Sequence, residues 1–525
     1  MGAGVVGVLP AGDTTRNVAT SISDRLSQEL VIALVGPVGS GVTTAAQLIR
    51  DLLVQDFGYK VAPIIKPSDI IRAESHRVGI GQIRTSPHDV YITDMQTAGN
   101  ALRQKFGANY LAEKTVERIY KFRLENGGLN EDGSVVPGRR AYIIDSIKNP
   151  EELALLKQIY EEQLCVFGIF APDEMRRQRL IDHGSDKAAV DNVLTRDRGE
   201  PMTFGQRTRK VFVEADFFIC NDRKVDELRS NLSRQLHIVF STSVHTPTRA
   251  ESAMYEASSA AANSACMSRQ VGAAVVSAKG ELIAVGWNDV PRFGGGLYGE
   301  DDRSVWDEGR HAVLDKDSRC FKWGGCVCHN EVRRTGIVDE IAQKIYKSSV
   351  VRKGTTYKQV RALLEGTKID ALIEFSRSIH AEMEAILSVA REGRNSLVGA
   401  TLYTNTYPCH NCARHIVASG IANVVYIEPY DKSLATTLHS DAISENPDDA
   451  TRVVFRQYDG VAPRNYLRLF RSGVERKENG KIVRRDPREA LPLFRMQLDA
   501  FTDYEAKVIA NLTDKEQNPD VGTER

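Results

Sequence analysis

Two short stretches in the second half of the chain carry side chains of the kinds that bind metal ions. The first holds His380 and, two residues later, Glu382; the second holds Cys409 and Cys412, directly after a proline. A catalytic zinc ion takes three protein ligands, commonly imidazole and thiolate, and leaves a fourth position for water, whose pKa falls to about 7. The two stretches therefore predict a Zn²⁺ site in which His380, Cys409 and Cys412 are the ligands.

Glu382 is the one residue of the two motifs that is not expected to be a metal ligand. It is close enough to His380 to reach the metal-bound water, and we expect it to move a proton from that water to a leaving amine. His-x-Glu followed by Pro-Cys-x-x-Cys is the signature of nucleobase deaminases, so the expected reaction is hydrolytic deamination of an amidine-like ring carbon. A structural zinc knuckle or a redox cysteine pair is the alternative, and neither explains Glu382. Glu384, at i+4 from His380, is either an orienting partner of that ligand or a solvent-facing residue.

The flanking sequence predicts the elements that position these residues. Small residues throughout 250–265 favour a helix packed closely against a sheet, and residues 270–277 and 281–286 predict a hairpin. Pro408 suits a helix start, where exposed amides stabilise a thiolate. We therefore expect the metal to join the beginnings of two adjacent helices.

The same residues resemble the deoxycytidylate deaminase branch of the cytidine deaminase superfamily. The resemblance rests on the two metal motifs and on residues 271–276, 286–291 and 401–416, within a region of about residues 250–430. It implies a cytidine deaminase-like α/β/α sandwich. In that family the asparagine matching Asn288 lies at the substrate pocket, which makes Asn288 the expected substrate contact; a turn-forming asparagine is the alternative.

Composition limits the remaining possibilities. The 525 residues exceed one ordinary core, so two or three domains are expected. Lys plus Arg and Asp plus Glu both number 69, which favours a small nucleotide over duplex nucleic acid as the partner. No apolar run reaches the roughly 20 residues of a membrane helix, and the first residues lack a secretory or myristoylation pattern. Eight cysteines fit a reducing compartment, so a cytoplasmic location is expected.

Residues 1–240 look like a P-loop nucleotide kinase that has lost a key residue. An apolar strand at 29–35 leads into a glycine-rich turn and an amphipathic helix at 45–53, which is the context of a phosphate-binding loop. Val42 stands where phosphoryl-transferring P-loops have a lysine, whose positive charge stabilises the transferred phosphoryl group. Binding of a nucleotide with Mg²⁺ is therefore expected rather than phosphoryl transfer. The candidate cofactor-binding residues are Gly36, Gly39, Ser40, Gly41, Thr43 and Thr44.

Later features of this region agree with that interpretation. Asp145 ends a second buried strand, at the place where such folds hold magnesium, and the arginines at 176–179 and 196–198 either bind polyphosphate or form a solvated helix face. Strands that alternate with helices predict an α/β domain with a parallel sheet. The resulting hypothesis is a regulatory nucleotide sensor.

The predicted organisation is the kinase-like domain at 1–240, a linker at 241–249, the deaminase-type domain at 250–470 and a C-terminal extension at 471–525. The deaminase-type domain contains an insert at 292–375. Four soft ligands gather in this insert and predict either a second, structural zinc or buried free thiols. These residues are Cys320, Cys326, Cys328 and His329.

A degenerate kinase-like domain ahead of a deoxycytidylate-type deaminase resembles the bacterial anti-phage dCTP deaminases. That resemblance implies conversion of dCTP to dUTP and dCMP to dUMP, depletion of the deoxycytidine nucleotide pool, and a regulatory small RNA as a partner. A homo-oligomer is also expected. Three alternatives remain open: a housekeeping dCMP deaminase for thymidylate supply, a cytosine deaminase acting on RNA or single-stranded DNA, and a non-catalytic regulator with structural zinc.

Overall fold

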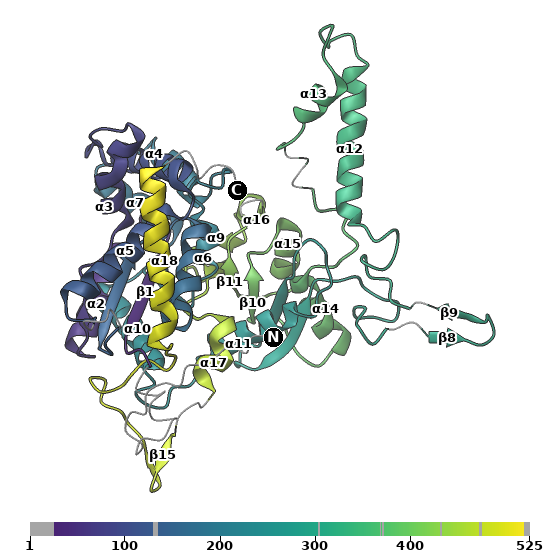
Figure 1. The fold of residues 1–525 in the computed structure, drawn as a ribbon. Helices are drawn as coiled ribbons and strands as arrows, with labels where there is room; N and C mark the ends of the chain where they lie inside the picture. Colours follow the sequence, from purple (N-terminus) through teal and green to yellow (C-terminus); the bar gives the residue numbers. More distant parts are fainter. Residues whose placement is uncertain are drawn as a thin grey trace, which may run out of the picture. The chain divides into compact units, whose positions relative to one another are not determined.

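The structure, a computed structural model, describes residues 26–518 in two compact units (Figure 1). The first unit comprises the residues up to 245 and those after 471, and the second comprises residues 246–471. Inside this span the residues left out of the description are 130–134, 303–304, 315, 368, 370–371, 431–432 and 472–474. The predictions that concern residues 1–25 and 519–525 lie outside the described residues.

The first unit is built on a parallel sheet. Its strands follow the spatial order β5-β4-β1-β3-β2, and each neighbouring pair is parallel. All residues of β1 and β3 are buried, which explains why these strands are nearly continuous apolar runs in the sequence. The strands are β1 (Leu30–Val35), β2 (Lys60–Val61), β3 (Arg140–Asp145), β4 (Leu164–Phe170) and β5 (Phe217–Cys220). The α/β class and the parallel sheet expected for this part of the chain are thus confirmed.

Helices connect these strands, as parallel pairing requires. Their bounds are α2 (Val42–Gln55), α3 (Pro67–Glu74), α4 (His88–Phe106), α5 (Tyr110–Glu125), α6 (Pro150–Tyr160), α7 (Asp173–Asp182), α8 (Val190–Arg198), α9 (Thr208–Phe212) and α10 (Val225–Val239). A small exposed hairpin, β15 (Lys477–Glu478) with β16 (Lys481–Ile482), also belongs to this unit.

The C-terminal segment contains a long helix of the first unit, α18 (Leu498–Gln517). Arg123 of α5, fully buried, donates to Glu505 of α18 at 2.6 Å and to Glu29 at 2.9 Å. Leu498 and Phe501 are also fully buried. The sequence did not reveal this helix because its core side includes Glu505, a charged residue that is buried only together with its partner.

The second unit holds a mixed sheet in the order β12-β13-β11-β10-β6-β7. The predicted hairpin is confirmed as the antiparallel pair β6–β7, β10 is antiparallel to β6, and the remaining pairs are parallel. The strands are β6 (Gly272–Val276), β7 (Leu282–Trp287), β10 (Thr401–Thr406), β11 (Asn423–Glu428), β12 (Ile443–Ser444) and β13 (Val453–Gln457). Shorter elements are β14 (Gly460–Val461), α16 (Ala435–Leu438) and α17 (Tyr466–Phe470).

Three helices complete the frame around this sheet: α11 (Arg249–Ala261), α14 (Ala381–Glu392) and α15 (His410–Ala418). Helix α14 lies very close to β7, since a Cβ placed on Gly286 would lie 2.5 Å from both the carbonyl oxygen of Ala381 and the amide nitrogen of Ala385. Glycine at this strand position therefore fixes how near the start of α14 lies to the sheet.

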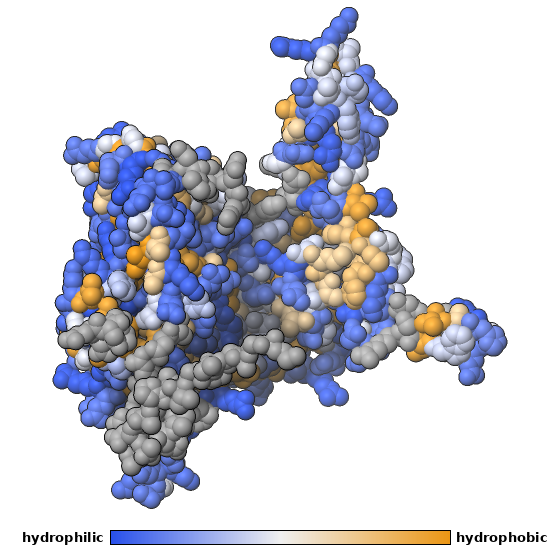
Figure 2. All heavy atoms as spheres, viewed as in Figure 1, coloured by the Kyte–Doolittle hydropathy of each residue, from blue (hydrophilic) through white to orange (hydrophobic). Residues whose placement is uncertain are grey.

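The insert forms two projections from the second unit (Figure 1). One is a helical pair, α12 (His329–Tyr346) and α13 (Tyr357–Ala362); the other is the hairpin β8 (Val305–Asp307) with β9 (Ala312–Leu314). Figure 2 shows apolar side chains on this hairpin, where Val305, Trp306 and Val313 are exposed. Among the described residues, no helix combines the length and apolar character needed to cross a membrane.

Candidate metal centre

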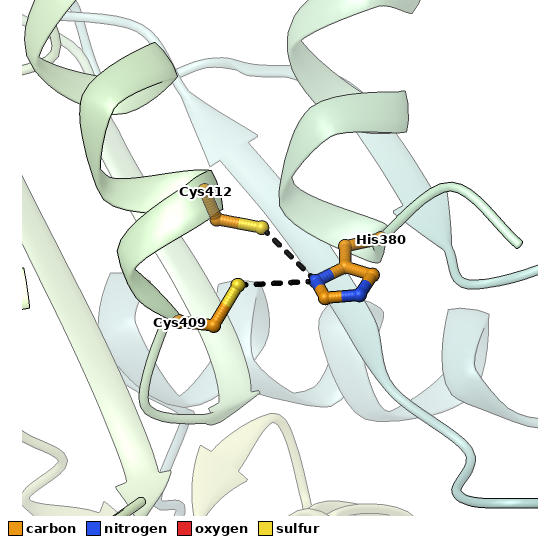
Figure 3. Close-up of side chains that lie close together, drawn as sticks. All are labelled: His380, Cys409 and Cys412. Atoms are coloured by element: carbon orange, nitrogen blue, oxygen red, sulfur yellow. Dashed lines mark hydrogen bonds between the residues drawn. The ribbon is translucent and has the colours of Figure 1, made fainter. Parts of the chain in front are cut away.

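The structure brings the three predicted metal ligands together. His380 is the N-cap of α14, Cys409 is the N-cap of α15, and Cys412 lies in the first turn of α15. Figure 3 shows their side chains converging from the starts of these two helices. His380 Nδ1 lies 3.3 Å from each of the two sulfur atoms, and the three ligand atoms all lie within 4.8 Å of one another.

The donor set fits zinc. Typical Zn–S and Zn–N bonds at tetrahedral angles place nitrogen and sulfur about 3.5 Å apart, close to the spacing seen here. Cys409 and Cys412 are buried. Hydrogen bonds with Cys412 and, against the effect of burial, with His380 lower the pKa of the Cys409 thiol to about 4. The metal-binding thiolate form of Cys409 is thus favoured before any ion arrives.

Glu382 lies beside the cluster without belonging to it. It is in the first turn of α14, is only 3% exposed, and accepts a hydrogen bond from the Cys412 thiol at 3.4 Å. Burial raises the pKa of its carboxyl, while the charge of His380 opposes the rise. A buried carboxyl with a raised pKa is the type of group that can give and take protons in a reaction.

Glu384 fits neither of its two predicted roles. It is buried rather than solvent-facing, and its carboxylate accepts a hydrogen bond from Arg391 at 2.9 Å. The described side-chain hydrogen bonds of His380 involve Cys409 and Cys412. Glu384 therefore ties the two ends of α14 together.

Asn288 follows β7 and lines the same cavity as the cluster. Its Oδ1 accepts from the amide of Val271 at 2.7 Å, and its Nδ2 donates to the carbonyl of Arg269 at 2.8 Å. Both ends of the side chain thus hold the loop before β6. The neighbouring Asp289, 1% exposed, accepts from the amides of Ala265 and Val290. Together they give the cavity a fixed wall, and a direct contact of Asn288 with substrate stays a prediction.

The cavity has a volume of about 410 Å³, a size typical of small-molecule sites. Besides His380, Glu382 and Cys409, it is lined by Arg269, Arg377 and Tyr430. Sequence reasoning missed these last three residues. Arg377 lies only three positions before His380, and this proximity is the one signal that could have indicated it.

The four residues predicted as a possible second zinc site do not all lie in the same place. Cys320, Cys328 and His329 line the cavity together with Cys266, whereas Cys326 is exposed and does not. Within the part of the chain that the structure describes, no three of these five side chains bring their ligand atoms within 4.8 Å of one another, as the His380 cluster does. The structure therefore does not assemble the second zinc site that was one of the two predictions.

The glycine-rich loop of the first unit precedes α2, with Gly41 as a left-handed N-cap. Thr43 donates to Asp145 at 2.8 Å, so a candidate cofactor-binding hydroxyl and the acid expected near magnesium are hydrogen-bonded to each other. The amide of Val38 donates to Asp197 at 2.8 Å. Lys148 supplies an ammonium group to this region, because its Nζ donates to Asp197 at 2.8 Å and to the carbonyl of Gly36 at 2.7 Å.

Two of the arginines predicted to bind polyphosphate, Arg176 and Arg179, donate hydrogen bonds to the glycine-rich loop itself. Arg176 donates to the carbonyl of Val38 at 3.3 Å, and Arg179 donates to the carbonyl of Gly39 at 3.1 Å. Asn221 donates to the carbonyl of Ser40 at 2.8 Å. The loop is thus held by side chains from several elements, and nucleotide binding by it stays a prediction.

Comparison with known proteins finds a family match within the second unit. Residues 247–428 match the family described as the cytidine and deoxycytidylate deaminase zinc-binding region. The deoxycytidylate deaminase of Enterobacteria phage T4 is 30% identical over 172 residues, 32% of this chain and 72% of the relative. That of Enterobacteria phage T2 is 32% identical over 170 residues, 32% of this chain and 74% of the relative. The crystal structure of a dCMP deaminase from cyanophage S-TIM5 shares 17% identity, covers 41% of this chain and all of that one, and has a TM-score of 0.21.

Proposed function

Because this chain belongs to the cytidine and deoxycytidylate deaminase family, we propose that it removes the amino group of cytosine in free deoxycytidine nucleotides. The observation that carries the proposal is the cluster of His380, Cys409 and Cys412 with the buried Glu382 beside it, at a cavity that His380, Cys409 and Glu382 line. The ligands proposed for zinc are these three side chains. When bound, zinc would supply a water that is activated at neutral pH.

Glu382 would perform the proton transfers. Its carboxyl gives a proton to ring N3 of cytosine, which makes C4 electrophilic, and it carries a further proton to the departing amine. The overall change adds water and releases ammonia, leaving uracil. Burial of Glu382 keeps bulk water away from these transfers. Asn288, through its bonds to residues 269 and 271, would hold the wall against which the nucleotide lies.

The proposed substrates include dCTP as well as dCMP. A cavity of about 410 Å³ that carries arginines on its wall suits an anionic nucleotide. The test is mass-spectrometric product analysis of zinc-replete protein offered dCMP, dCTP, CMP, CTP, adenine nucleotides and a cytosine-containing single strand. Deamination of dCTP and dCMP alone supports the proposal. Deamination of dCMP alone would favour a housekeeping enzyme for thymidylate supply, and deamination of the strand alone would favour a polynucleotide editor.

We also propose that this activity depletes deoxycytidine nucleotides during phage infection, under control of the first unit. The support is the arrangement along the chain, in which a loop of phosphate-binding type precedes the deaminase unit. Calorimetry with ATP, GTP and the deoxynucleotides tests binding by the first unit. Plaque counts and nucleotide pools in bacteria carrying the wild type or Glu382→Ala test the defensive role, and unchanged plaque counts would contradict it.

Two further parts of the proposal concern partners. Restraint by a small RNA predicts that RNA purifies with the silent protein and that ribonuclease treatment raises its turnover. Assembly into a homo-oligomer predicts a mass by light scattering that is a multiple of the 58.2 kDa chain. Turnover that ribonuclease does not change would contradict restraint by RNA, and the mass of a single chain would contradict the homo-oligomer.

A further inference from the structure

Among the residues that the structure describes, Arg377 is the arginine of the active-site cavity whose charge is not offset by an acid. Arg269, on the same cavity, forms an ion pair with Glu428 at 3.2 Å. For Arg377, by contrast, the contacts among the described residues are with a carbonyl and an aromatic ring, and no acidic side chain pairs with it. The carboxyls on the cavity wall belong to Asp289, which accepts two backbone amides, and to Glu382.

The insert holds Arg377 in place. Its guanidinium carbon lies 4.0 Å from the ring centroid of Trp323, and its NH1 donates to the carbonyl of Ser318 at 3.0 Å. Stacking on an aromatic face leaves the edge of a guanidinium group available, and one donor out of five is used by Ser318. Arg377 therefore presents a restrained fork of N–H donors at the half-buried wall of the cavity.

The position of Arg377 relative to the metal cluster suits the phosphate group of a nucleotide. Arg377 lies three positions before His380, and three steps along the chain span at most about 11 Å. That is the scale of a nucleotide measured from its base to its phosphate. Guanidinium groups bind phosphate through paired hydrogen bonds that a neutral sugar cannot replace.

We propose that Arg377, held by Trp323 of the insert, binds the 5′-phosphate of the nucleotide whose base lies at the metal cluster. This inference rests on the proposed function, because it takes the cavity to be the nucleotide site. The insert would then contribute to substrate choice: it selects nucleotides over nucleosides. Trp323 is a positioning residue, since it does not line the cavity.

The test compares substrates with and without phosphate. Arg377→Ala should lower kcat/KM for dCMP and dCTP by about 10- to 100-fold, the effect of losing hydrogen bonds to a charged group. With deoxycytidine, which has no phosphate, it should change kcat/KM by less than about 3-fold. Arg377→Lys should recover part of the loss, and Trp323→Ala should cause a smaller loss with the same phosphate dependence. Arg394→Ala, an exposed arginine that does not line the cavity, is the matched control.

Equilibrium binding separates this inference from the proposed function. In a Glu382→Ala background, where turnover is not required, adding Arg377→Ala should weaken binding of dCMP by the same factor and leave binding of deoxycytidine unchanged. Absence of turnover in the wild type together with this binding pattern would refute the proposed function and keep the role of Arg377. Equal losses with dCMP and deoxycytidine, or no loss with either, would overturn the role of Arg377.

Discussion

Gly286 offers a test of how strictly the sheet positions the catalytic helix. The substitution Gly286→Ala places a methyl group 2.5 Å from Ala381 O and 2.5 Å from Ala385 N, whereas ordinary carbon contacts need 3.4 Å or more. Neither neighbour can rotate away, because both atoms belong to the backbone of α14. The helix must therefore move outward by up to about 0.9 Å, the difference between 3.4 Å and 2.5 Å, and His380 and Glu382 move with it.

The expected cost follows from that displacement. A shift on the order of 1 Å in catalytic groups lowers activity by about 100-fold, and overpacking of a well-packed site lowers the free energy of unfolding by about 1–3 kcal/mol. The assay is kcat/KM for dCMP, with zinc content and a denaturant titration measured on the same preparation. We expect a folded protein that retains zinc and has lost most of its turnover.

Gly336→Ala is the matched control. Gly336 lies inside the exposed helix α12, where an added Cβ meets nothing within 4 Å, so the change should leave kcat/KM unaltered and stabilise that helix by up to about 1 kcal/mol. Wild-type kcat/KM in Gly286→Ala would show that α14 tolerates displacement and would refute the positioning argument.

Three further predictions concern the metal, the proton carrier and the core of the first unit. Glu382→Gln should retain zinc and lose about 100- to 10,000-fold in kcat, as measured by product formation; substantial residual turnover would exclude its role in proton transfer. Cys412→Ala should lower the zinc content per chain by elemental analysis, whereas the exposed Cys326→Ala should not; equal zinc in both would contradict the assignment. Arg123→Met should lower the free energy of unfolding by about 3–5 kcal/mol, because it removes the cation that the buried Glu29 and Glu505 share, leaving Glu29 with Arg140 and Glu505 with the hydroxyl of Tyr160; the exposed Lys121→Ala should change it by less than about 1 kcal/mol, and equal effects would contradict this explanation.

The metal cluster was predictable because its signal is local in the sequence. His-x-Glu and Pro-Cys-x-x-Cys each occupy one helix start, so spacing along the chain is enough to indicate the ligands and the adjacent acid. The hairpin β6–β7 and the buried strands β1 and β3 were predictable for the same reason, since their apolar patterns are contained within a few residues.

The parts that escaped prediction depend on partners far apart in the chain. Glu505 looks like a surface residue until Arg123 is placed beside it, and so α18 was not recognised. Lys148 stands far from the glycine-rich loop in sequence, yet it donates to Gly36. Arg377 acquires a defined position through Trp323 and Ser318, two residues of the insert.

The central claim is that the cluster at the starts of α14 and α15 deaminates a free deoxycytidine nucleotide. The most direct measurement is the mass of the product formed when purified, zinc-replete protein is incubated with dCMP or with dCTP, alongside Glu382→Ala. We expect the mass change of an amino group replaced by oxygen, with release of ammonia, in the wild type alone. Unchanged dCMP and dCTP in the wild type would contradict it, as would equal conversion by Glu382→Ala.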